Sequence, residues 1–309
     1  MQTLVLWSTR QDTLLQTMPF SSPLERYRGR RLCLSSQHRK EQALARPFRA
    51  GLGMILVTPA GLDTDRFGSF CGAQPRLTDA QQSCRQKTEA GMELSGLTLG
   101  LGSEGSFGPH PALPWLAAGS EWLTFMDREA ALVIEESRIS ARTNFSHLET
   151  KPGAAIDSWL HQIGFPSHAV LVRPQQPPGL SSAAPVAKGI QRRDLLDRAI
   201  RDAATRSADG MALLETDMRA HVNPTRMRAI RQLGIQLVRR LRRPCPACGA
   251  PGWGLIERLP GLPCRWCGQP TERVALEIFG CAACDHQQER PRPDGLLAAD
   301  PEHCLTCNP

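Results

Sequence analysis

The chain has 309 residues, of which 41% are hydrophobic and 22% are charged, and its formal net charge is +7. This composition is typical of a folded globular protein large enough for two domains. It excludes a disordered acidic tail, a collagen-like fibre and a coiled coil. No run of 18 apolar residues is present, and the opening residues lack the pattern of a secretory signal. We therefore expect a cytoplasmic protein with no membrane partner.

The positive charge is concentrated in one segment. Residues 191–243 contain 13 arginines and six acidic residues, a difference that equals the net charge of the whole chain. Such a segment can attract nucleic acid, a nucleotide phosphate or a membrane surface. It can equally form solvated helices with ion pairs one turn apart, such as Asp194 with Arg198 and Asp197 with Arg201. The solvated alternative is favoured, because arginine outnumbers lysine throughout the chain and not only here.

Strands and helices alternate along the first three quarters of the chain. After an N-terminal extension over residues 1–28, strands are predicted at residues 31–35, 54–58, 97–101, 121–126, 131–135, 168–172 and 211–214. Helices are predicted at residues 38–52, 78–94, 154–163, 192–205 and 224–242, with a proline-rich loop at residues 174–185. This alternation favours an α/β domain over residues 29–243, built as a layered mixed sheet with flanking helices.

Eight of the 11 cysteines lie in the last 65 residues as four Cys-x-x-Cys pairs: Cys245/Cys248, Cys264/Cys267, Cys281/Cys284 and Cys304/Cys307. Each pair directs two thiolates at one position, and two pairs complete a tetrahedral shell for Zn²⁺. Disulfides are disfavoured in a reducing cytoplasm. The sequence therefore predicts a zinc-ribbon module with two structural zinc ions over residues 244–309, stabilised by its metal because so short a segment has little core.

The pairing of the four motifs is open between two arrangements. The alternation of Val274, Leu276 and Ile278 predicts a strand between the second and third pairs. A knuckle, a strand and a second knuckle make a zinc ribbon, which favours the second pair with the third and leaves the outer pairs to share the other ion. The sequential arrangement, first with second and third with fourth, is a close alternative. The remaining cysteines are expected to be buried free thiols: Cys33, Cys71 and Cys84.

Two polar stretches of the α/β domain follow predicted strands and contain residue types that bind metal ions and phosphates. Residues 63–70 include Asp63 and Asp65, two carboxylates one residue apart. Residues 102–108 form a glycine-spaced loop in which Glu104 is a candidate metal ligand. Backbone N–H groups in such a loop can approach a phosphate. The candidate binding residues there are Ser103, Gly105 and Ser106.

A third polar stretch, residues 215–226, is dense in groups that bind anions or transfer protons. Asn223 is expected to cap a helix that begins at Pro224, leaving the N-terminus of that helix open to an anion. The other candidates are Asp217, Arg219, His221, Thr225 and Arg226. Each stretch alone can equally be a capped polar turn. All three lie at strand ends of one α/β domain, which is where such folds place active sites.

A long motif resembles an uncharacterised bacterial family described only as a domain of unknown function. The motif is the string TDMRAHVNPTRM at residues 216–227, preceded by SEGSFGPHP at residues 103–111 and followed by the Cys-x-x-Cys pairs. The resemblance extends from about Arg30 to Pro309 and implies no activity.

The order of motifs is also similar to that of the inosine-triphosphate pyrophosphatase family, which cleaves noncanonical purine nucleoside triphosphates to monophosphate and pyrophosphate with Mg²⁺. Residues 35–40, SSQHRK, resemble the family's Thr-x-Asn-x-x-Lys motif after its first strand. Its acidic residue, Thr-Phe pair and lysine-bearing helix correspond to Asp65, residues 69–70 and Lys87. Residues 103–106 correspond to its metal-binding loop, and residues 224–226 to its late Ser-His-Arg.

The departures from this second family are substantial. Ser103 and Glu104 replace its Asp-Asp pair, its Glu-Glu-Asn-Ala run is missing, and it has no zinc module. The resemblance therefore implies a pyrophosphatase-like fold more strongly than a shared reaction.

Two functions from different classes follow from these observations. In the first, the chain is a Mg²⁺-dependent hydrolase of a nucleotide or related phosphate ester. Asp63, Asp65 and Glu104 hold the metal and activate water, while the phosphate charge is neutralised by Lys40, Lys87 and Arg226. In the second, the chain is a non-catalytic module that binds nucleic acid or protein through its arginine-rich segment and zinc ribbons. The ribbons are poor in aromatic residues, which favours the enzyme. A plainer third alternative has the ribbons mediate oligomer contacts.

Overall fold

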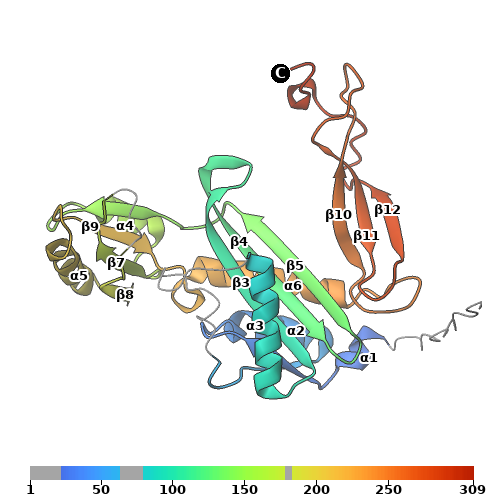
Figure 1. Ribbon diagram of the computed structural model, residues 1–309, viewed down its shortest axis with the longest axis horizontal. Coiled ribbons are helices and arrows are strands. Elements are labelled where there is room, and N and C mark those ends of the chain that lie inside the picture. The colour runs from blue at the N-terminus through green and yellow to red at the C-terminus, as the bar shows by residue number, and fades with distance from the viewer. Residues whose placement is uncertain (1–21, 63–78, 178–182) are drawn as a thin grey trace, which may run out of the picture.

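The computed structural model describes residues 22–62, 79–177 and 183–309. These residues form a central α/β domain, a smaller second lobe and a C-terminal module (Figure 1). Within the described ranges, no helix has both the length and the apolar character needed to cross a membrane.

The central domain is built on a five-stranded mixed sheet with the order β2-β1-β3-β4-β5. β1 pairs in parallel with both β2 and β3, whereas β4 is antiparallel to β3 and to β5. The strands are β1 (Arg31–Ser35), β2 (Ile55–Val57), β3 (Leu99–His110), β4 (Leu113–Asp127) and β5 (Leu132–Ser140). The sheet thus combines a parallel half, where the polar loop after β1 lies, with a long antiparallel half.

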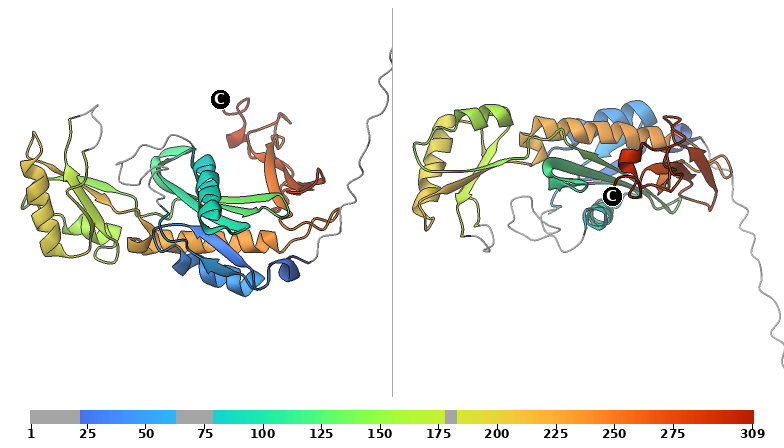
Figure 2. Two further views of the ribbon diagram at one scale, coloured as in Figure 1. Left: turned by 60° about the horizontal axis from the view of Figure 1, so that its bottom comes forward. Right: turned by 90° about the horizontal axis from the view of Figure 1, so that it is seen from above.

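Helices cover both faces of this sheet (Figure 2). α2 (Glu41–Leu52) and α6 (Pro224–Leu241) pack on one face around a leucine-rich core, and α3 (Ala80–Ser95) packs on the other. α1 (Pro23–Tyr27) falls within the segment that the sequence assigns to an N-terminal extension, yet its Tyr27 is fully buried in the same core. Part of that extension therefore belongs to the central domain.

The absence of a side chain at Gly102 lets α3 lie very close to β3. A Cβ at this position would lie 2.1 Å from Oγ1 of Thr88 and 2.5 Å from the carbonyl oxygen of Cys84. Cys33 and Cys84 are buried free thiols as predicted, and Cys71 lies outside the described residues. This close packing fixes the position of α3 relative to the end of β3, where the candidate site lies.

The second lobe has its own sheet and its own apolar core. Its four antiparallel strands have the order β6-β9-β7-β8. They are β6 (His147–Thr150), β7 (Val170–Pro174), β8 (Ala187–Ile190) and β9 (Ala212–Thr216), and the core also includes α4 (Asp157–Ile163) and α5 (Arg193–Thr205). A 3-10 turn, η2 (Ala220–Val222), leads from β9 into α6.

Two of the three arginines of α5 are paired with acids of the same helix. The predicted pair of Asp194 and Arg198 is present at 3.0 Å. Asp197 pairs with Arg193 at 3.0 Å instead of with Arg201. These exposed pairs neutralise much of the charge on this helix, in agreement with the solvated-helix alternative for this part of the basic segment.

α6 runs from the second lobe along the central sheet to the C-terminal module (Figure 2). The module is a three-stranded antiparallel sheet with the order β10-β11-β12. Its elements are β10 (Gly254–Pro260), β11 (Val274–Gly280), β12 (Gln287–Pro291) and the 3-10 turn η3 (Pro301–His303). Arg240 of α6 links the two parts, because its side chain donates to the carbonyl oxygens of Gly252 and Glu135.

The predicted helices and strands are present in this order, with three differences. Residues 102–108 are not a loop but the second half of β3, because they pair continuously with β4 and this pairing outweighs the turn preference of their glycines. α2 begins at Glu41 rather than at residue 38, since Arg39 has a left-handed backbone with φ of 53°. Helix α1 and strands β6, β8, β10 and β12 were not predicted.

Candidate functional site

The eight clustered cysteines form two groups of four, each able to hold one metal ion. One group is Cys245, Cys248, Cys281 and Cys284, and the other is Cys264, Cys267, Cys304 and Cys307. In the first group two Sγ–Sγ distances are 3.9 and 3.6 Å, and in the second 3.9 and 3.5 Å. Four sulfurs around Zn²⁺, each with a Zn–S bond of about 2.3 Å, would be about 3.8 Å apart. The spacing fits a tetrahedral metal site and is far too long for disulfides.

The first pair therefore combines with the third and the second with the fourth, which corrects both arrangements proposed from the sequence. The sheet explains this interleaving. The first pair precedes β10 and the third follows β11, and these two ends meet because the strands are antiparallel. β12 then carries the chain back to the opposite end, where the fourth pair meets the second. The two metal sites thus lie at opposite ends of one small sheet.

Backbone N–H groups point at the sulfurs, as the small and polar residues of the knuckles predict. The amides of Ala247 and Ala283 donate to the Sγ atoms of Cys245 and Cys281 at 3.4 and 3.3 Å. The amide of Trp266 donates to a sulfur of the second group at 3.4 Å. Such bonds stabilise thiolates, so both groups are suited to a cation with four closed ligand positions.

A second concentration of chemically active side chains lies in the central domain, beyond the end of β1. We call it the buried charge cluster, and it consists of Lys40, Lys87, Glu104, Glu121 and Arg226, all buried. It contains three cations and two carboxylates. Buried charges are costly unless they are paired or bind a ligand, so each member needs a physical explanation.

On the α6 face of the sheet, Arg226 pairs with Glu121 of β4. Its Nε donates to Oε1 at 2.7 Å, and Nη1 donates to the carbonyl oxygen of Met218. The guanidinium also lies over the ring of Phe107, 5.1 Å from its centroid. Gly105 makes room for this pair, because a Cβ there would lie 2.5 Å from Nη2 of Arg226. The residues predicted at 103–106 and at 226 are thus brought together.

On the α3 face, Lys87 donates to Oε2 of Glu104. Both side chains are almost completely buried. Gly102 and Glu104 project from the same face of β3, since residues two apart on a strand share a face. The close approach of α3 described above therefore places Lys87 directly against Glu104.

Lys40 lies between these two pairs and has no carboxylate partner among the described residues. Its Nζ donates to the carbonyl oxygen and to Oγ of Ser103, at 2.9 and 3.1 Å. Burial, and then the nearby charge of Arg226, lowers the pKa of Lys40 to about 8. An ammonium group has three donors, and the described residues accept from two of them.

Histidines and a second ion pair extend the cluster. His38 and His221 stack with ring centroids 5.3 Å apart. Burial, followed by the positive charge of Lys40, lowers the pKa of His38 to about 3, so this ring is neutral near pH 7. Although burial opposes its ionisation, Arg219 keeps the pKa of Asp217 below its usual value. The field in this region is therefore positive.

Two further observations at the end of β1 indicate a ligand. Within the described residues, the buried hydroxyls of Ser35 and Ser36 have no hydrogen-bond partner. Buried polar atoms are nearly always satisfied, so the partner of each hydroxyl is to be sought in a ligand or in a part of the chain outside the described residues. Arg39, three residues further on, has the left-handed backbone noted above. Non-glycine residues in this conformation are concentrated at ligand sites.

The remaining predicted site residues have other positions. Asp63 and Asp65 lie outside the described residues. Ser103, Gly105 and Ser106 belong to β3, and the ladder with β4 replaces the phosphate-binding loop expected there. Asn223 caps α6 as predicted, accepting from the amide of Arg226 at 3.0 Å.

The N-terminus of α6 is occupied by protein groups rather than left open. The amide of Thr225 donates to Nε2 of His168 at 3.3 Å, and the hydroxyl of Thr225 lies 2.9 Å from the same atom.

The sequence analysis missed Glu121 and His38 as site residues. Glu121 could have been noticed as a carboxylate at the start of a strand with Leu123, Phe125 and Met126, since an acid beside such an apolar run needs a partner.

The comparisons with known proteins are consistent with the long motif. No curated protein and no solved structure matches the chain. The model of one family, described as a domain of unknown function (DUF6671), matches residues 87–309. This match covers more than half of the chain, including the second half of α3, the second lobe and all eight clustered cysteines. The chain belongs to this family.

Proposed function

We propose that the central domain binds and hydrolyses a nucleotide or a related phosphate ester at the buried charge cluster, in a reaction that uses Mg²⁺. The observation that carries this proposal is the buried ammonium of Lys40, which has Ser103 as its only hydrogen-bonding residue among those described. A phosphate would supply the negative charge that the three cations of the cluster need beyond their two carboxylates.

The surrounding residues support the same ligand. The orphaned hydroxyl of Ser36 is a donor suited to a phosphate oxygen, whereas that of Ser35 lies against Gly91 of α3. Ser36 follows a parallel strand, which is where open α/β sheets bind their ligands. In the motif that residues 35–40 resemble, the last position is a lysine, and Lys40 stands there in this chain.

Mg²⁺ prefers carboxylate oxygens and water as ligands. Of the three proposed metal ligands, Glu104 alone lies within the described residues. Its carboxylate is buried beside Lys87. Asp63 and Asp65 would complete the set. Bound there, the ion would polarise a phosphate oxygen and activate water.

We assign Zn²⁺ to both cysteine groups. Four thiolates at tetrahedral spacing with no open position are typical of structural zinc sites, and they do not support catalysis. The module therefore contributes a rigid extension rather than reactive groups.

Replacing Lys40 by methionine is expected to weaken the binding of inorganic pyrophosphate and of a nucleoside triphosphate by at least about tenfold, since a charge-assisted hydrogen bond contributes about 1.5–3 kcal/mol.

The wild-type affinity is also expected to fall as the pH rises above about 8, by up to about tenfold per pH unit, because the free protein then loses the charge of Lys40. The pH series uses the nucleoside triphosphate alone, because its terminal phosphate has a second pKa of about 6 and keeps a constant charge there, whereas pyrophosphate loses its last proton in the same range. Titration calorimetry without Mg²⁺ measures both effects.

Lys151→Met is the matched control, because Lys151 is exposed on the second lobe. It should bind like the wild type at every pH, and Lys40→Met should show no decline above pH 8. Equal affinities of Lys40→Met and the wild type would contradict the proposal.

A further inference from the structure

Two helices form a layer that is poor in acidic residues on the outside of the central sheet. α2 and α6 pack against each other there and make up the outermost layer of that face in both views of Figure 2. α6 contains five arginines and no acidic residue, and α2 contains two arginines and one glutamate. Six exposed arginines of this layer, which we call the arginine face, are Arg46, Arg49, Arg228, Arg231, Arg239 and Arg242.

The arginine face follows one side of α6. Arg228 and Arg231 lie in the first half of the helix, Arg239 and Arg242 lie at its end, and Ile235 lies between the two pairs. Successive positions in this row are three or four residues apart, and such steps keep side chains on the same side of a helix. At a rise of about 1.5 Å per residue, the row is about 21 Å long. The helix therefore presents its exposed positive charges as a line.

α2 adds a second, shorter row beside the first. The guanidinium of Arg231 donates to the carbonyl oxygen of Gln42 at 3.4 Å, and a Cβ at Gly51 would lie 2.2 Å from Cγ1 of Val238. The two helices therefore lie side by side and run in the same direction. Both arginines of α2 lie between these two contacts along the helix, so they extend the arginine face sideways.

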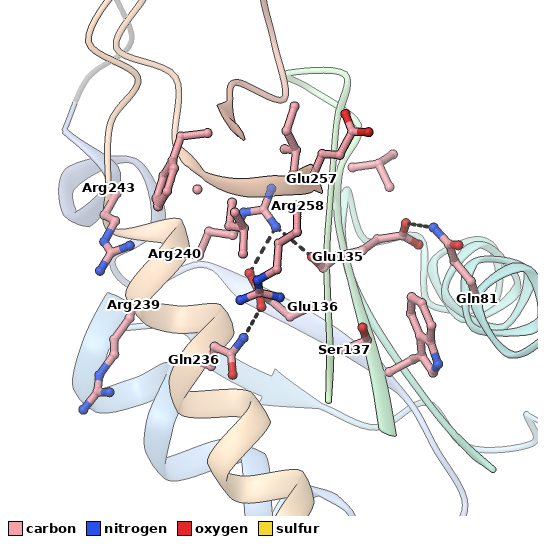
Figure 3. A pocket seen from close by; sticks show the side chains of 16 residues that line it. Gln81, Glu135, Glu136, Ser137, Gln236, Arg239, Arg240, Arg243, Glu257 and Arg258 are labelled. Carbon is pink, nitrogen blue, oxygen red and sulfur yellow. Dashed lines mark hydrogen bonds and ion pairs between the residues drawn. The ribbon is translucent and has the colours of Figure 1, made fainter. Parts of the chain in front are cut away.

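Ion pairs do not account for this face, in contrast to the arginines of α5. Among the described residues, no arginine of the face has an ion pair, and Arg231 alone has a side-chain hydrogen bond. Figure 3 shows the difference at neighbouring positions: Arg240 pairs with Glu136 in the cavity between β5, the end of α6 and β10, whereas Arg239 points away from that glutamate. The arginine bias of the whole chain does not explain why α6 lacks acids, because α5 shares the bias and has its acids.

The arrangement also opposes the stability of α6 itself. Like charges three or four residues apart on a helix repel each other, as Arg228 and Arg231 do, and again Arg239 and Arg242. The negative end of the helix dipole offsets this repulsion at the C-terminal pair but not at the pair in the first half. A row that costs stability and has no acidic partner among the described residues indicates an anionic partner outside the chain.

The chemistry of the face favours double-stranded nucleic acid among the possible anionic partners. Guanidinium groups bind phosphates in two-point contacts, and a row of about 21 Å spans about six base-pair steps of a duplex. The two helices expose no aromatic side chain, since Phe48 is fully buried, so an unpaired strand would find no stacking surface. Ile235, 37% exposed, is the one large apolar side chain that they expose, which is too little to insert into a lipid surface.

We propose that the arginine face binds double-stranded nucleic acid through its phosphates, independently of base sequence. Contacts to phosphates hold a protein on a duplex without reading its bases. The face shares no residue with the buried charge cluster, so this binding goes beyond the proposed hydrolysis. Either proposal can therefore fail without the other.

The test is the binding of the full-length protein to a fluorescent DNA duplex of about 24 base pairs, followed by anisotropy at about 50–200 mM salt. The wild type should bind with a Kd of about 1–100 µM at physiological salt. Its log K should fall with log salt at a slope of about −4 to −5, as about five phosphate contacts require. Arg228→Gln combined with Arg231→Gln should weaken binding at least about tenfold at the lowest salt and make the slope less steep by about two.

Arg198→Gln combined with Arg206→Gln is the matched control. It removes the same charge from two exposed arginines of the same basic segment, which are paired with Asp194 and Asp202. This variant should keep the affinity and the salt slope of the wild type, and far-UV circular dichroism should show that both variants keep their fold. Equal losses in the two double variants would reduce the effect to net charge and overturn the proposal.

Three further ligands decide the class of partner. An RNA duplex of the same sequence should also bind, since phosphates provide the contacts. A single strand of the same length, and vesicles of phosphatidylcholine with phosphatidylserine, should both bind more weakly than the DNA duplex. Tighter binding of the single strand or of the vesicles, or no binding of either duplex at the lowest salt, overturns the proposal.

Discussion

A protein with Cys245→Ser and Cys264→Ser is expected to lose both metal ions, whereas one with Cys245→Ser and Cys281→Ser should lose only one. In the interleaved pairing, Cys245 and Cys264 belong to different metal sites, whereas Cys245 and Cys281 belong to the same site. A structural zinc site is closed by four protein ligands. A site that lacks one of its four thiolates is therefore expected to lose its ion. Zinc content per chain, measured by atomic emission on purified variants, gives the answer directly.

The three possible pairings of the cysteine motifs predict different zinc contents for these two variants. A sequential pairing would reverse the two results, and a nested pairing would remove both ions in both variants. Either outcome would contradict the interleaved arrangement. The remaining site should keep its ion, because the sheet separates the two groups and each group is held by its own pair of knuckles.

Arg226→Met is expected to destabilise the central domain by about 3–5 kcal/mol, because it leaves the carboxylate of Glu121 buried without a partner. Denaturant unfolding followed by tryptophan fluorescence measures this change. Arg228→Met is the matched control on the same helix, since Arg228 is exposed, and it should stay within about 0.5 kcal/mol of the wild type.

Replacing Glu121 by leucine in the same protein should restore part of the lost stability, since no unpaired charge then remains. A loss below about 1 kcal/mol in Arg226→Met would show that Glu121 is hydrated or otherwise satisfied. That result would be inconsistent with a dry, buried charge cluster.

The metal ligands could be predicted from the sequence, but their pairing could not. The Cys-x-x-Cys spacing identifies all eight cysteines because two thiolates on one turn already define half of a site. The pairing depends on β12, whose residues are all exposed and show no apolar alternation. Only its hydrogen bonds with β11 reveal that it returns the chain to the far end of the sheet.

In the candidate site, too, most residues could be identified from the sequence, but their contacts could not. Lys40 and Lys87 could be singled out through the motifs that resemble the pyrophosphatase family, and Arg226 through its polar stretch at the start of a predicted helix. Glu121 was missed because its role depends on the register of β4 against β3, which places it opposite Gly105. The glycines of residues 102–108 have strong local turn preferences, and long-range pairing overrides them. The residues of the site were thus largely predictable, whereas their contacts depend on strand register.

The structure bears on the alternative that the chain binds nucleic acid through its arginine-rich segment or its zinc ribbons. Two of the three arginines of α5 are paired within the helix, which weakens the case for nucleic acid along that part of the basic segment. The knuckles of the second cysteine group expose Trp266 and Leu305, and the neighbouring Arg265 is paired with Asp300. Neither feature favours nucleic acid at these two places, and phosphate chemistry remains the proposal for the central domain.

The most direct test of the central claim is the release of phosphate and pyrophosphate from a panel of nucleoside triphosphates and simpler phosphate esters in the presence of Mg²⁺. The wild type should release product from at least one of them, and Glu104→Gln should reduce the rate by about 100-fold or more while retaining its fold and zinc. Glu89→Gln, which changes an exposed carboxylate on α3, should match the wild type. No release from any compound, or equal rates in wild type and Glu104→Gln, would contradict the assignment of a hydrolase.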